Sequence, residues 1–482
     1  MVLMSKVRTR FAPSPTGFMH VGNLRTGLFA WLVARHADGK FILRLEDTDK
    51  NREVVGSADH ILKCLETLGI DTDEGLDKGG PFAPYKQSSR LDIYKRWAQK
   101  LIDSGRAYAD PYTPEEVQEF RNQAKNKKQA FLFRNHRPEN PPSWDGTTPL
   151  RFKSDPKSYN WHDEVMGDLS SGPEVIDDFI IIKSDGYPTY NFAHIVDDAE
   201  MQISHVIRGQ EFISSQPNYM NLYEALELVP PIFATMPHIL NEHGNKKLGK
   251  RDGAKDVLNY IQEGYLPETL LSFIATLGWN DGTEQEIFTQ KELIEKFSLS
   301  RVQKSGARFD EKRLLWMNGQ FIRELPLSDL YQRVGAFWPE SAKNSTDDYR
   351  MQVLSLAQDR LKTLSDLAIL TNYFFVDTEP NLLLISGNKQ LKKIKPAEQV
   401  QLLETTKARL SQIKEWKAAD IQDCLNNLLM ETDQKPGTLF SLIRIATTWA
   451  PFSPQLNDTM GLIGRDVCLR RIDQAIELID KT

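Results

Sequence analysis

The sequence predicts an α/β protein in which a parallel sheet near the N-terminus is followed by an entirely helical C-terminal part. Residues 7–49 read as strand, glycine-containing turn, helix and strand, the pattern of a βαβ unit and hence of parallel strands. Beyond about residue 326 the apolar residues keep a helical spacing almost throughout. With 482 residues the chain exceeds one average domain, so we expect several.

The βαβ unit begins with VRTRF at 7–11, which we interpret as a strand closed by the turn-rich APSPTG. The next segment, 23–39, has its apolar residues on one helical stripe, and we expect the helix to begin at Asn23 and to end with Gly39 as its C-cap. KFILRLEDTD at 40–49 is the second strand, with acids at its C-terminal end. Parallel strands place a ligand crevice at their C-terminal ends.

The middle of the chain has a mixed pattern. Residues 90–130 are helical, and TPEEVQEF has a threonine and glutamates placed as a capping box. A proline-rich loop at 134–149 and strand-like runs at 150–153 and 175–183 follow. We therefore expect an α+β insertion here, with helices dominating from about residue 256.

Composition excludes several classes of protein. The three cysteines are widely scattered and form no CxxC pair, which argues against a disulfide framework and a thiolate zinc site. No apolar run approaches the ~18–20 residues that span a bilayer. The apolar stretch at the start of the sequence is too short for a signal peptide. We expect a cytoplasmic protein that does not enter membranes. The net charge of −6 gives no bulk attraction for nucleic acid.

Two short motifs could bind a polyphosphate, although the chain has no GxxxxGK[ST] loop. PSPTGFMHVGN at 13–23 places His20 just before a helix start, where backbone N–H groups favour phosphate. HGNKKLGKRDGA at 243–254 interleaves lysines with glycines, as a closing phosphate-binding loop requires. Each has an ordinary alternative, because a histidine there is commonly a structural hydrogen-bonding residue and a charge run a solvated loop.

Together the motifs resemble the two signatures of class I aminoacyl-tRNA synthetases, HIGH (His20-Val21-Gly22-Asn23) and KMSKS (Lys247-Leu248-Gly249-Lys250-Arg251). Seven segments in order resemble bacterial-type glutamyl-tRNA synthetase, densely over residues 7–325: RFAPSPTG, HVGNLRTGLF, RLEDTD, YKQSSR, DGYPTYNFAHIVDD, HVIRGQEF and GYLPETLLSFIATLGW. The resemblance implies a Rossmann-type catalytic domain with an insertion, followed by helical anticodon-binding domains.

By resemblance, the chain divides into six parts. They are the first catalytic half at 1–100, an acceptor-binding insertion at 101–187, the second catalytic half at 188–255, a stem-contact helical region at 256–325, and anticodon-binding helical domains at 326–385 and 386–482.

The family activates L-glutamate with ATP and Mg²⁺, releases pyrophosphate and transfers glutamyl to the terminal adenosine of tRNA-Glu; whether tRNA-Gln is also charged is left open. The resemblance implies a monomer and the following sites. The catalytic residues are His20, Lys247 and Lys250. The ATP site adds Gly22, Asn23 and Arg251. The glutamate site comprises Arg10, Ala12, Ser14, Glu46, Tyr190, His194 and Arg208. For tRNA we single out Arg360 and Arg444.

The chain departs from the family pattern at several positions. Gly249 replaces the signature serine, His194 stands where a smaller residue is common, and Gln210 replaces an acid. Ala109 and Pro111 stand where some members have zinc-binding cysteines, so we expect no zinc. Three alternatives are weighed: glutaminyl-tRNA synthetase, which usually ends in β-barrels; a truncated paralogue, for which the chain is too long; and a non-catalytic tRNA-binding relative.

Overall fold

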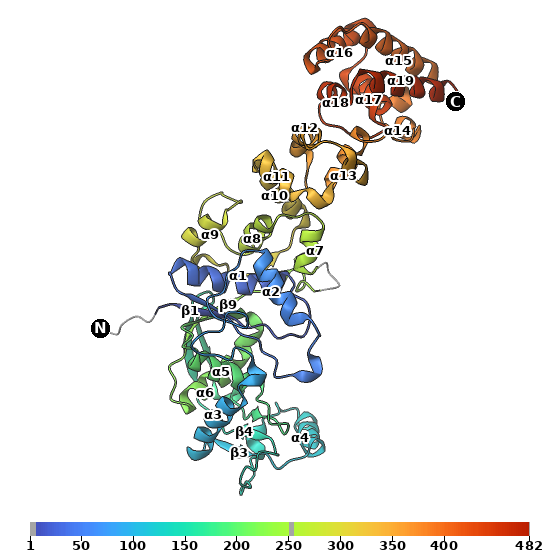
Figure 1. The fold of residues 1–482 in the computed structure, drawn as a ribbon. Coiled ribbons are helices and arrows are strands. Elements are labelled where there is room, and N and C mark those ends of the chain that lie inside the picture. The colour runs from blue at the N-terminus through green and yellow to red at the C-terminus, as the bar shows by residue number, and fades with distance from the viewer. Residues whose placement is uncertain (1–5, 250–254, 482) are drawn as a thin grey trace. The chain divides into compact units, whose positions relative to one another are not determined.

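The computed structural model describes residues 6–249 and 255–481, and the chain forms two compact units (Figure 1). The N-terminal unit comprises Met1–Tyr260 and Pro267–Glu311, and the C-terminal unit comprises Ile261–Leu266 and Lys312–Thr482. The predicted fold class is confirmed, because parallel strands lie at the centre of the first unit and, within its described residues, the second is built of helices.

Parallel strands form the centre of the N-terminal unit. They are β1 (Arg8–Phe11), β2 (Lys40–Leu43), β8 (His205–Gly209) and β9 (Ile232–Met236). β1 pairs with β2 and β8 with β9, while the backbone N–H of Ser204 donates to the carbonyl of Arg8 (2.9 Å) and so joins the two pairs. Figure 1 shows α1 (Val21–His36) on one side of these strands and α5 (Tyr190–Glu200) and α6 (Gln216–Ala225) on the other.

Helix α1 covers the sheet with a fully apolar face, since Leu24, Leu28 and Leu32 are buried. Two details of its prediction are wrong. The helix begins at Val21 rather than Asn23, because the side chain of His20 caps it. It ends at His36, and Asp38, not Gly39, takes the left-handed conformation (φ 48°) of the terminating turn. The N–H of Gly39 instead closes that turn on the carbonyl of Ala34 (2.7 Å).

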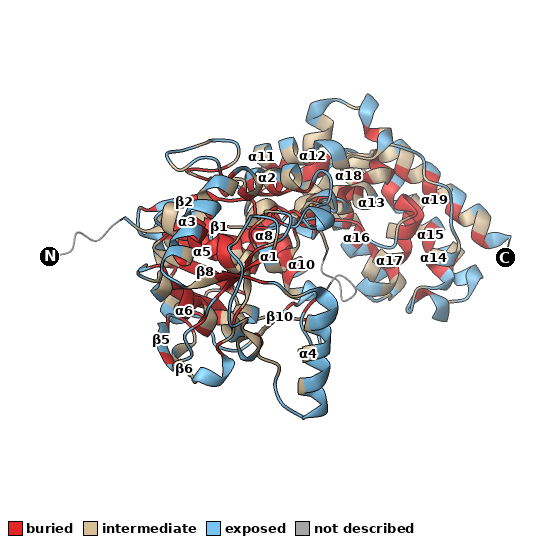
Figure 2. Ribbon diagram, turned by 90° about the horizontal axis from the view of Figure 1, so that it is seen from below, coloured by how far each residue is buried: buried red, intermediate tan, exposed pale blue. Residues whose placement is uncertain are grey.

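The insertion is a small mixed layer. Its antiparallel strands are β3 (Ala107–Ala109), β4 (Leu150–Phe152) and β7 (Ile180–Ile182), so the strand predicted at 150–153 is confirmed and the one at 175–183 is shorter than expected. The capping box of α4 (Pro114–Asn126) is confirmed, with Thr113 and Glu116 bonded reciprocally. No residue of α4 is buried (Figure 2). Sequence reasoning missed the hairpin of β5 (Tyr159–Asp163) and β6 (Gly167–Ser171), which pairs with β9.

The N-terminal unit also contains α2 (Ser57–Thr67), α3 (Leu91–Asp103), α8 (Pro267–Ala275) and α9 (Gln290–Lys296), and in it β10 (Ile239–Leu240) pairs in parallel with β11 (Ala307–Arg308). Helix α7 (Val257–Gln262) crosses from the N-terminal to the C-terminal unit, and α10 (Glu311–Glu324) belongs to the C-terminal unit from Lys312 onward. The further α-helices of the C-terminal unit are α11 (Leu327–Arg333), α12 (Asp347–Ala357), α13 (Asp366–Thr371), α14 (Leu383–Ser386), α15 (Pro396–Ser411), α16 (Ala418–Thr432), α17 (Pro436–Thr448), α18 (Leu456–Ile463) and α19 (Arg465–Asp480). No helix of the described residues is long and apolar enough to cross a membrane.

The close approach at Gly39 generates a prediction. A Cβ at this position would lie 2.3 Å from the carbonyl oxygen of Val7, which is backbone and also accepts from the N–H of Lys40 (2.8 Å). We expect Gly39→Ala to destabilise the protein by about 1–3 kcal/mol, because the strand pair carrying Arg10 must shift. Chemical denaturation measures the change. Gly335→Ala is the control, since a Cβ there meets no heavy atom within 4 Å; an equal effect of the two substitutions would contradict the prediction.

Candidate active site

A cavity of about 630 Å³ opens at the C-terminal ends of β1, β8 and β9, where parallel strands are expected to hold a ligand. Ten of the residues predicted from the sequence line it: Arg10, Ala12, Ser14, His20, Gly22, Asn23, Glu46, Tyr190, Arg208 and Lys247. They come from segments almost 240 residues apart in the chain, brought together by the sheet. Lys250 and Arg251 lie outside the described residues.

His20 stands at one end of the cavity and shapes the start of α1. Its Nδ1 accepts from the backbone N–H of Gly22 (3.1 Å), so in the neutral ring the proton belongs on Nε2. The first turn of α1 contains no acidic residue, so nothing there neutralises the positive end of the helix dipole. This end of the cavity is suited to an anion, and to a phosphate in particular.

Lys247 reaches the same end from the loop after β10. Its ammonium lies 3.6 Å from a carboxylate oxygen of Glu211, and it is more than half exposed. Glu211 also faces His238 (3.8 Å). Arg25 is buried beside them, and burial, opposed by the charge of Glu211, lowers its pKa to about 10. Sequence reasoning missed Arg25 and Glu211, although both lie inside the segments that carried the resemblance.

The opposite end of the cavity holds two buried arginines in different surroundings. Arg10 donates from Nε and Nη2 to the carboxylate of Asp198 (3.0 and 3.4 Å) and from Nη1 to the carbonyl of Ile207 (3.3 Å). Arg208 is only 6% exposed and packs on three aromatic rings, those of Phe212, Tyr219 and Phe233, at 5.1–5.4 Å. Within the described part of the chain no carboxylate pairs with Arg208.

Glu46 lies near these arginines and is tied to the protein interior. It accepts from Nη2 of Arg44 (3.0 Å), whose side chain has no exposed surface. Burial raises the pKa of Glu46, against the opposing charges of Arg44 and Arg10. Burial disfavours the charge of Arg44, but Asp198, Glu46 and Asp197 together raise its pKa well above the usual value.

Tyr190 and His194 lie one turn apart on α5 and stack on each other, with ring centroids 4.7 Å apart. Tyr190 lines the cavity, whereas His194 is not among the lining residues. Nδ1 of His194 donates to the carbonyl of Tyr190 (2.7 Å). Burial and the neighbouring charge of Arg208 lower the pKa of His194 to about 3, so the ring is neutral. His194 therefore supports Tyr190 from behind.

The described residues include one group that could hold a metal ion: His60, Cys64 and Asp256, whose ligand atoms lie within 4.8 Å of one another. These atoms already have partners. His60 Nε2 is 2.9 Å from Asp256, and its Nδ1 accepts from the N–H of Met19 (3.4 Å). Burial raises the pKa of Cys64 to about 12, so its thiol is protonated.

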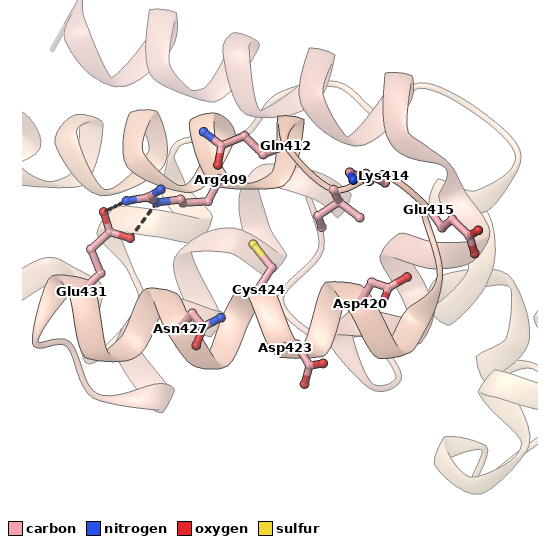
Figure 3. A pocket seen from close by; sticks show the side chains of 10 residues that line it. Arg409, Gln412, Lys414, Glu415, Asp420, Asp423, Cys424, Asn427 and Glu431 are labelled. Carbon is pink, nitrogen blue, oxygen red and sulfur yellow. Dashed lines mark hydrogen bonds and ion pairs between the residues drawn. The ribbon is translucent and has the colours of Figure 1, made fainter.

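The C-terminal unit contains an open hollow of about 790 Å³ between α15 and α16 (Figure 3). Four acids line it, and one of them, Glu431, forms an ion pair with Arg409 (2.8 Å). The two arginines singled out for tRNA lie elsewhere in this unit. Arg360 is exposed, while Arg444 is held by the hydroxyl of Ser453 (3.0 Å). Burial and the charge of Arg360 lower the pKa of Arg444.

Comparison with known proteins agrees with the architecture. Residues 6–316 match the family model for tRNA synthetases class I (E and Q), catalytic domain, and residues 329–476 match an anticodon-binding domain. The chain is 40% identical to a glutamate–tRNA ligase of Dehalococcoides mccartyi and 38% identical to one of Clostridium kluyveri, in each case over 98% of both chains.

Solved structures give the same result. A glutamate tRNA ligase from Elizabethkingia meningosepticum, crystallised in complex with its amino acid, superposes with a TM-score of 0.86 at 33% identity, covering 98% of this chain and all of the other. The chain belongs to the class I tRNA synthetases of the glutamate and glutamine type, and it is a glutamate–tRNA ligase.

Proposed function

We propose that the cavity binds L-glutamate at the end containing Arg10, Glu46 and Arg208, and ATP at the end containing His20 and Lys247. The observation that carries the proposal is Arg208, a buried guanidinium to which the described part of the chain gives no carboxylate partner. A buried charge is costly unless it is paired, so this residue is suited to receiving the carboxylate of a ligand.

The charges around Tyr190 support glutamate as that ligand. Three buried arginines each have a carboxylate partner: Arg10 with Asp198, Arg44 with Glu46 and Arg90 with Asp197. Arg208 remains, so this end of the cavity has one positive charge in excess. Glutamate carries two carboxylates and one ammonium, hence one net negative charge, whereas glutamine carries none. The balance favours glutamate.

The same balance assigns the substrate's groups. The ammonium and α-carboxylate form a neutral pair, which is suited to Glu46 and Arg10, whose own charges are compensated by the protein. The side-chain carboxylate carries the net charge and is assigned to Arg208. A guanidinium without a competing carboxylate can present two parallel N–H groups to it. Ser14 and Ala12 line the wall beside these groups, and Tyr190 adds a hydroxyl.

Activation then needs no side-chain nucleophile, because the α-carboxylate of glutamate attacks the α-phosphate of ATP. The bond from that phosphorus to the pyrophosphate oxygen breaks, and glutamyl-adenylate forms. Negative charge grows on the phosphates, where the Nε2 proton of His20, the start of α1 with Gly22 and Asn23, and Lys247 provide fixed donors. We assign Lys250 and Arg251 of the signature loop to the leaving pyrophosphate. Mg²⁺ enters with ATP and neutralises its phosphates.

The second step transfers glutamyl from the adenylate to the 3′-terminal adenosine of tRNA-Glu. We propose that the insertion at 101–187 contacts the acceptor end, that the helices at 256–325 contact the stem, and that those of 326–385 and 386–482 read the anticodon through Arg360 and Arg444. Stacking on guanidinium planes is a common way to recognise unpaired bases. We propose that the protein acts as a monomer. Charging assays with tRNA-Glu and tRNA-Gln side by side decide whether the second tRNA is also a substrate.

The remaining alternative is a tRNA-binding relative without catalysis. Gly249, Gln210 and His194 favour it, because they depart from the family pattern. Against it stands the complete set of buried charges at the glutamate end, which no binding of tRNA alone would need. Pyrophosphate exchange with glutamate, ATP and tRNA-Glu separates the two: a chain that binds tRNA-Glu and shows no exchange would contradict the proposed chemistry.

Arg208→Ala should weaken glutamate binding by about 2–5 kcal/mol, which raises the KM for glutamate at least about thirtyfold. The reason is that a substrate carboxylate loses its only uncompensated partner. The KM for ATP should stay nearly constant. Arg106→Ala is the control, since this arginine also packs on an aromatic ring, that of Phe152 at 5.3 Å, but does not line the cavity. A larger change in the KM for ATP than for glutamate would show that Arg208 is assigned to the wrong ligand.

Lys250→Ala should slow adenylate formation by about 10²–10³-fold, because one donor to the departing pyrophosphate is lost. Glutamate affinity should be nearly unchanged. Single-turnover measurement of adenylate formation tests this, and Lys246→Ala, an exposed lysine of the same loop, is the control. Near-normal turnover of Lys250→Ala would remove the loop from the chemistry.

Removing Mg²⁺ should stop the reaction, whereas a chelator selective for zinc should change neither activity nor stability. The sequence has no cysteines at 109 and 111, and the thiol of Cys64 is buried and protonated. Elemental analysis of the purified protein checks the expectation, and one tightly bound equivalent of zinc would refute it. Cys64→Ser would then show whether His60, Cys64 and Asp256 hold the ion.

A further inference from the structure

Two residues outside the cavity connect the groups that meet the zwitterionic end of glutamate. Arg10 and Glu46 both line the cavity, and Asp198 and Arg44 join them behind its wall. We propose that Asp198 is a positioning residue for glutamate, which fixes the guanidinium of Arg10 and, through Arg44, the carboxylate of Glu46. The inference rests on the proposed placement of glutamate and adds residues that do not touch it.

The geometry is a chain of alternating charges. One oxygen of Asp198 accepts from both Nε of Arg10 (3.0 Å) and Nη1 of Arg44 (2.7 Å), and the other accepts from Nη2 of Arg10 (3.4 Å). Arg44 continues the chain, since its Nη2 donates to Glu46 at 3.0 Å. Two N–H groups of Arg10 are therefore committed to Asp198, which sets the direction in which the rest of its guanidinium points.

Burial makes this chain rigid. Asp198 is 2% exposed and Arg44 is completely buried, so water competes little for these hydrogen bonds. The charges of Arg10 and Arg44, working against burial, lower the pKa of Asp198 to about 2, and the carboxylate stays ionised at any working pH. Without it, Arg10 and Arg44 would be two neighbouring buried cations that repel each other.

The adjacent residue, Asp197, provides a matched comparison. It is also buried and ionically paired, but its partners are Arg90 (2.7 Å), Gln87 (2.8 Å) and the hydroxyl of Tyr94 (2.8 Å), none of which lines the cavity. Its contact with Arg44 is longer, at 3.8 Å. Both aspartates are therefore buried and paired with arginines. Of the two, only Asp198 bonds directly to a residue that lines the cavity, Arg10.

The experiment compares Asp198→Asn with Asp197→Asn in the full-length protein by pyrophosphate exchange with glutamate, ATP and tRNA-Glu. Both variants should lower the unfolding temperature. Asp198→Asn should raise the KM for glutamate about tenfold to hundredfold and leave the KM for ATP within about threefold. Asp197→Asn should leave both constants within about threefold of the parent. Equal effects of the two variants on glutamate, or an unchanged glutamate KM in Asp198→Asn, would overturn the proposal.

A double-mutant cycle shows whether Asp198 acts through Arg10. If it does, Arg10→Gln combined with Asp198→Asn should have a glutamate KM close to that of the worse single variant. The reason is that Asp198 has no guanidinium left to position once Arg10 is replaced. If the fold-changes in the glutamate KM of the two single variants multiply in the double variant, Asp198 does not act through Arg10. Should Asp198→Asn fail to fold, Asp198→Glu keeps the charge and displaces it by one methylene; a raised glutamate KM with normal ATP supports positioning, and a parent-like glutamate KM refutes it.

The parent protein distinguishes this inference from the function on which it rests. If the parent shows no glutamate-dependent exchange, the proposed chemistry fails before any variant is compared. If the parent is active and Arg208→Ala loses glutamate selectively while Asp198→Asn does not, the placement of glutamate stands and only the positioning role of Asp198 is wrong.

Discussion

The pairing of buried charges beneath the cavity is the constraint on which the N-terminal unit depends. Arg44 has no exposed surface, so it is tolerated only with Asp198 and Glu46 bonded to its guanidinium. These partners come from different segments: Arg44 and Glu46 directly follow β2, and Asp198 lies on α5. Each of these charged groups needs the others as partners. Asp198, which neutralises Arg44 in the interior, therefore also fixes Arg10 at the wall of the cavity.

Periodicity and spacing predict the fold class and the edge of the sheet where a ligand lies, whereas most of the cavity residues were predicted from the resemblance to glutamyl-tRNA synthetase. The alternation of strand, turn and helix over residues 7–49 predicts parallel strands, and parallel strands predict where a ligand lies. The two signature motifs contribute His20, Gly22, Asn23 and Lys247, and the structure brings them to one cavity. The wider resemblance to the family adds the remaining lining residues, among them Arg10 and Tyr190, which are far apart in the chain. These residues were predictable because each lies in a segment that resembles the family; taken alone, Arg10 or Glu46 would be interpreted as an ordinary surface or ion-pairing residue.

Other features could not be predicted because they depend on contacts between distant residues. Nothing in the local sequence indicates that Asp198 bonds to Arg10 and Asp197 to Arg90, since the two neighbours differ only in what faces them. The terminating turn of α1 was misassigned because glycine is the usual left-handed residue, whereas here Asp38 adopts that conformation and Gly39 is needed for its closeness to Val7. The β5–β6 hairpin was missed because its strands are mostly polar and half-exposed, which hides the alternation.

The proposed glutamate site has one positive charge in excess, and this balance requires that the neighbouring histidine stays neutral. His194 lies between Tyr190 and Tyr219, and a proton on its ring would add a second positive charge beside Arg208. Burial and Arg208 itself prevent this by lowering the pKa of His194 to about 3. Glu46 behaves differently, because burial raises its pKa, whereas the charges of Arg10 and Arg44 lower the pKa of Asp198 to about 2. On the proposed placement of glutamate, protonation of Glu46 removes the partner of the substrate's ammonium and adds positive charge to the cavity, so acid should impair recognition of the substrate through Glu46 before it neutralises Asp198 or protonates His194.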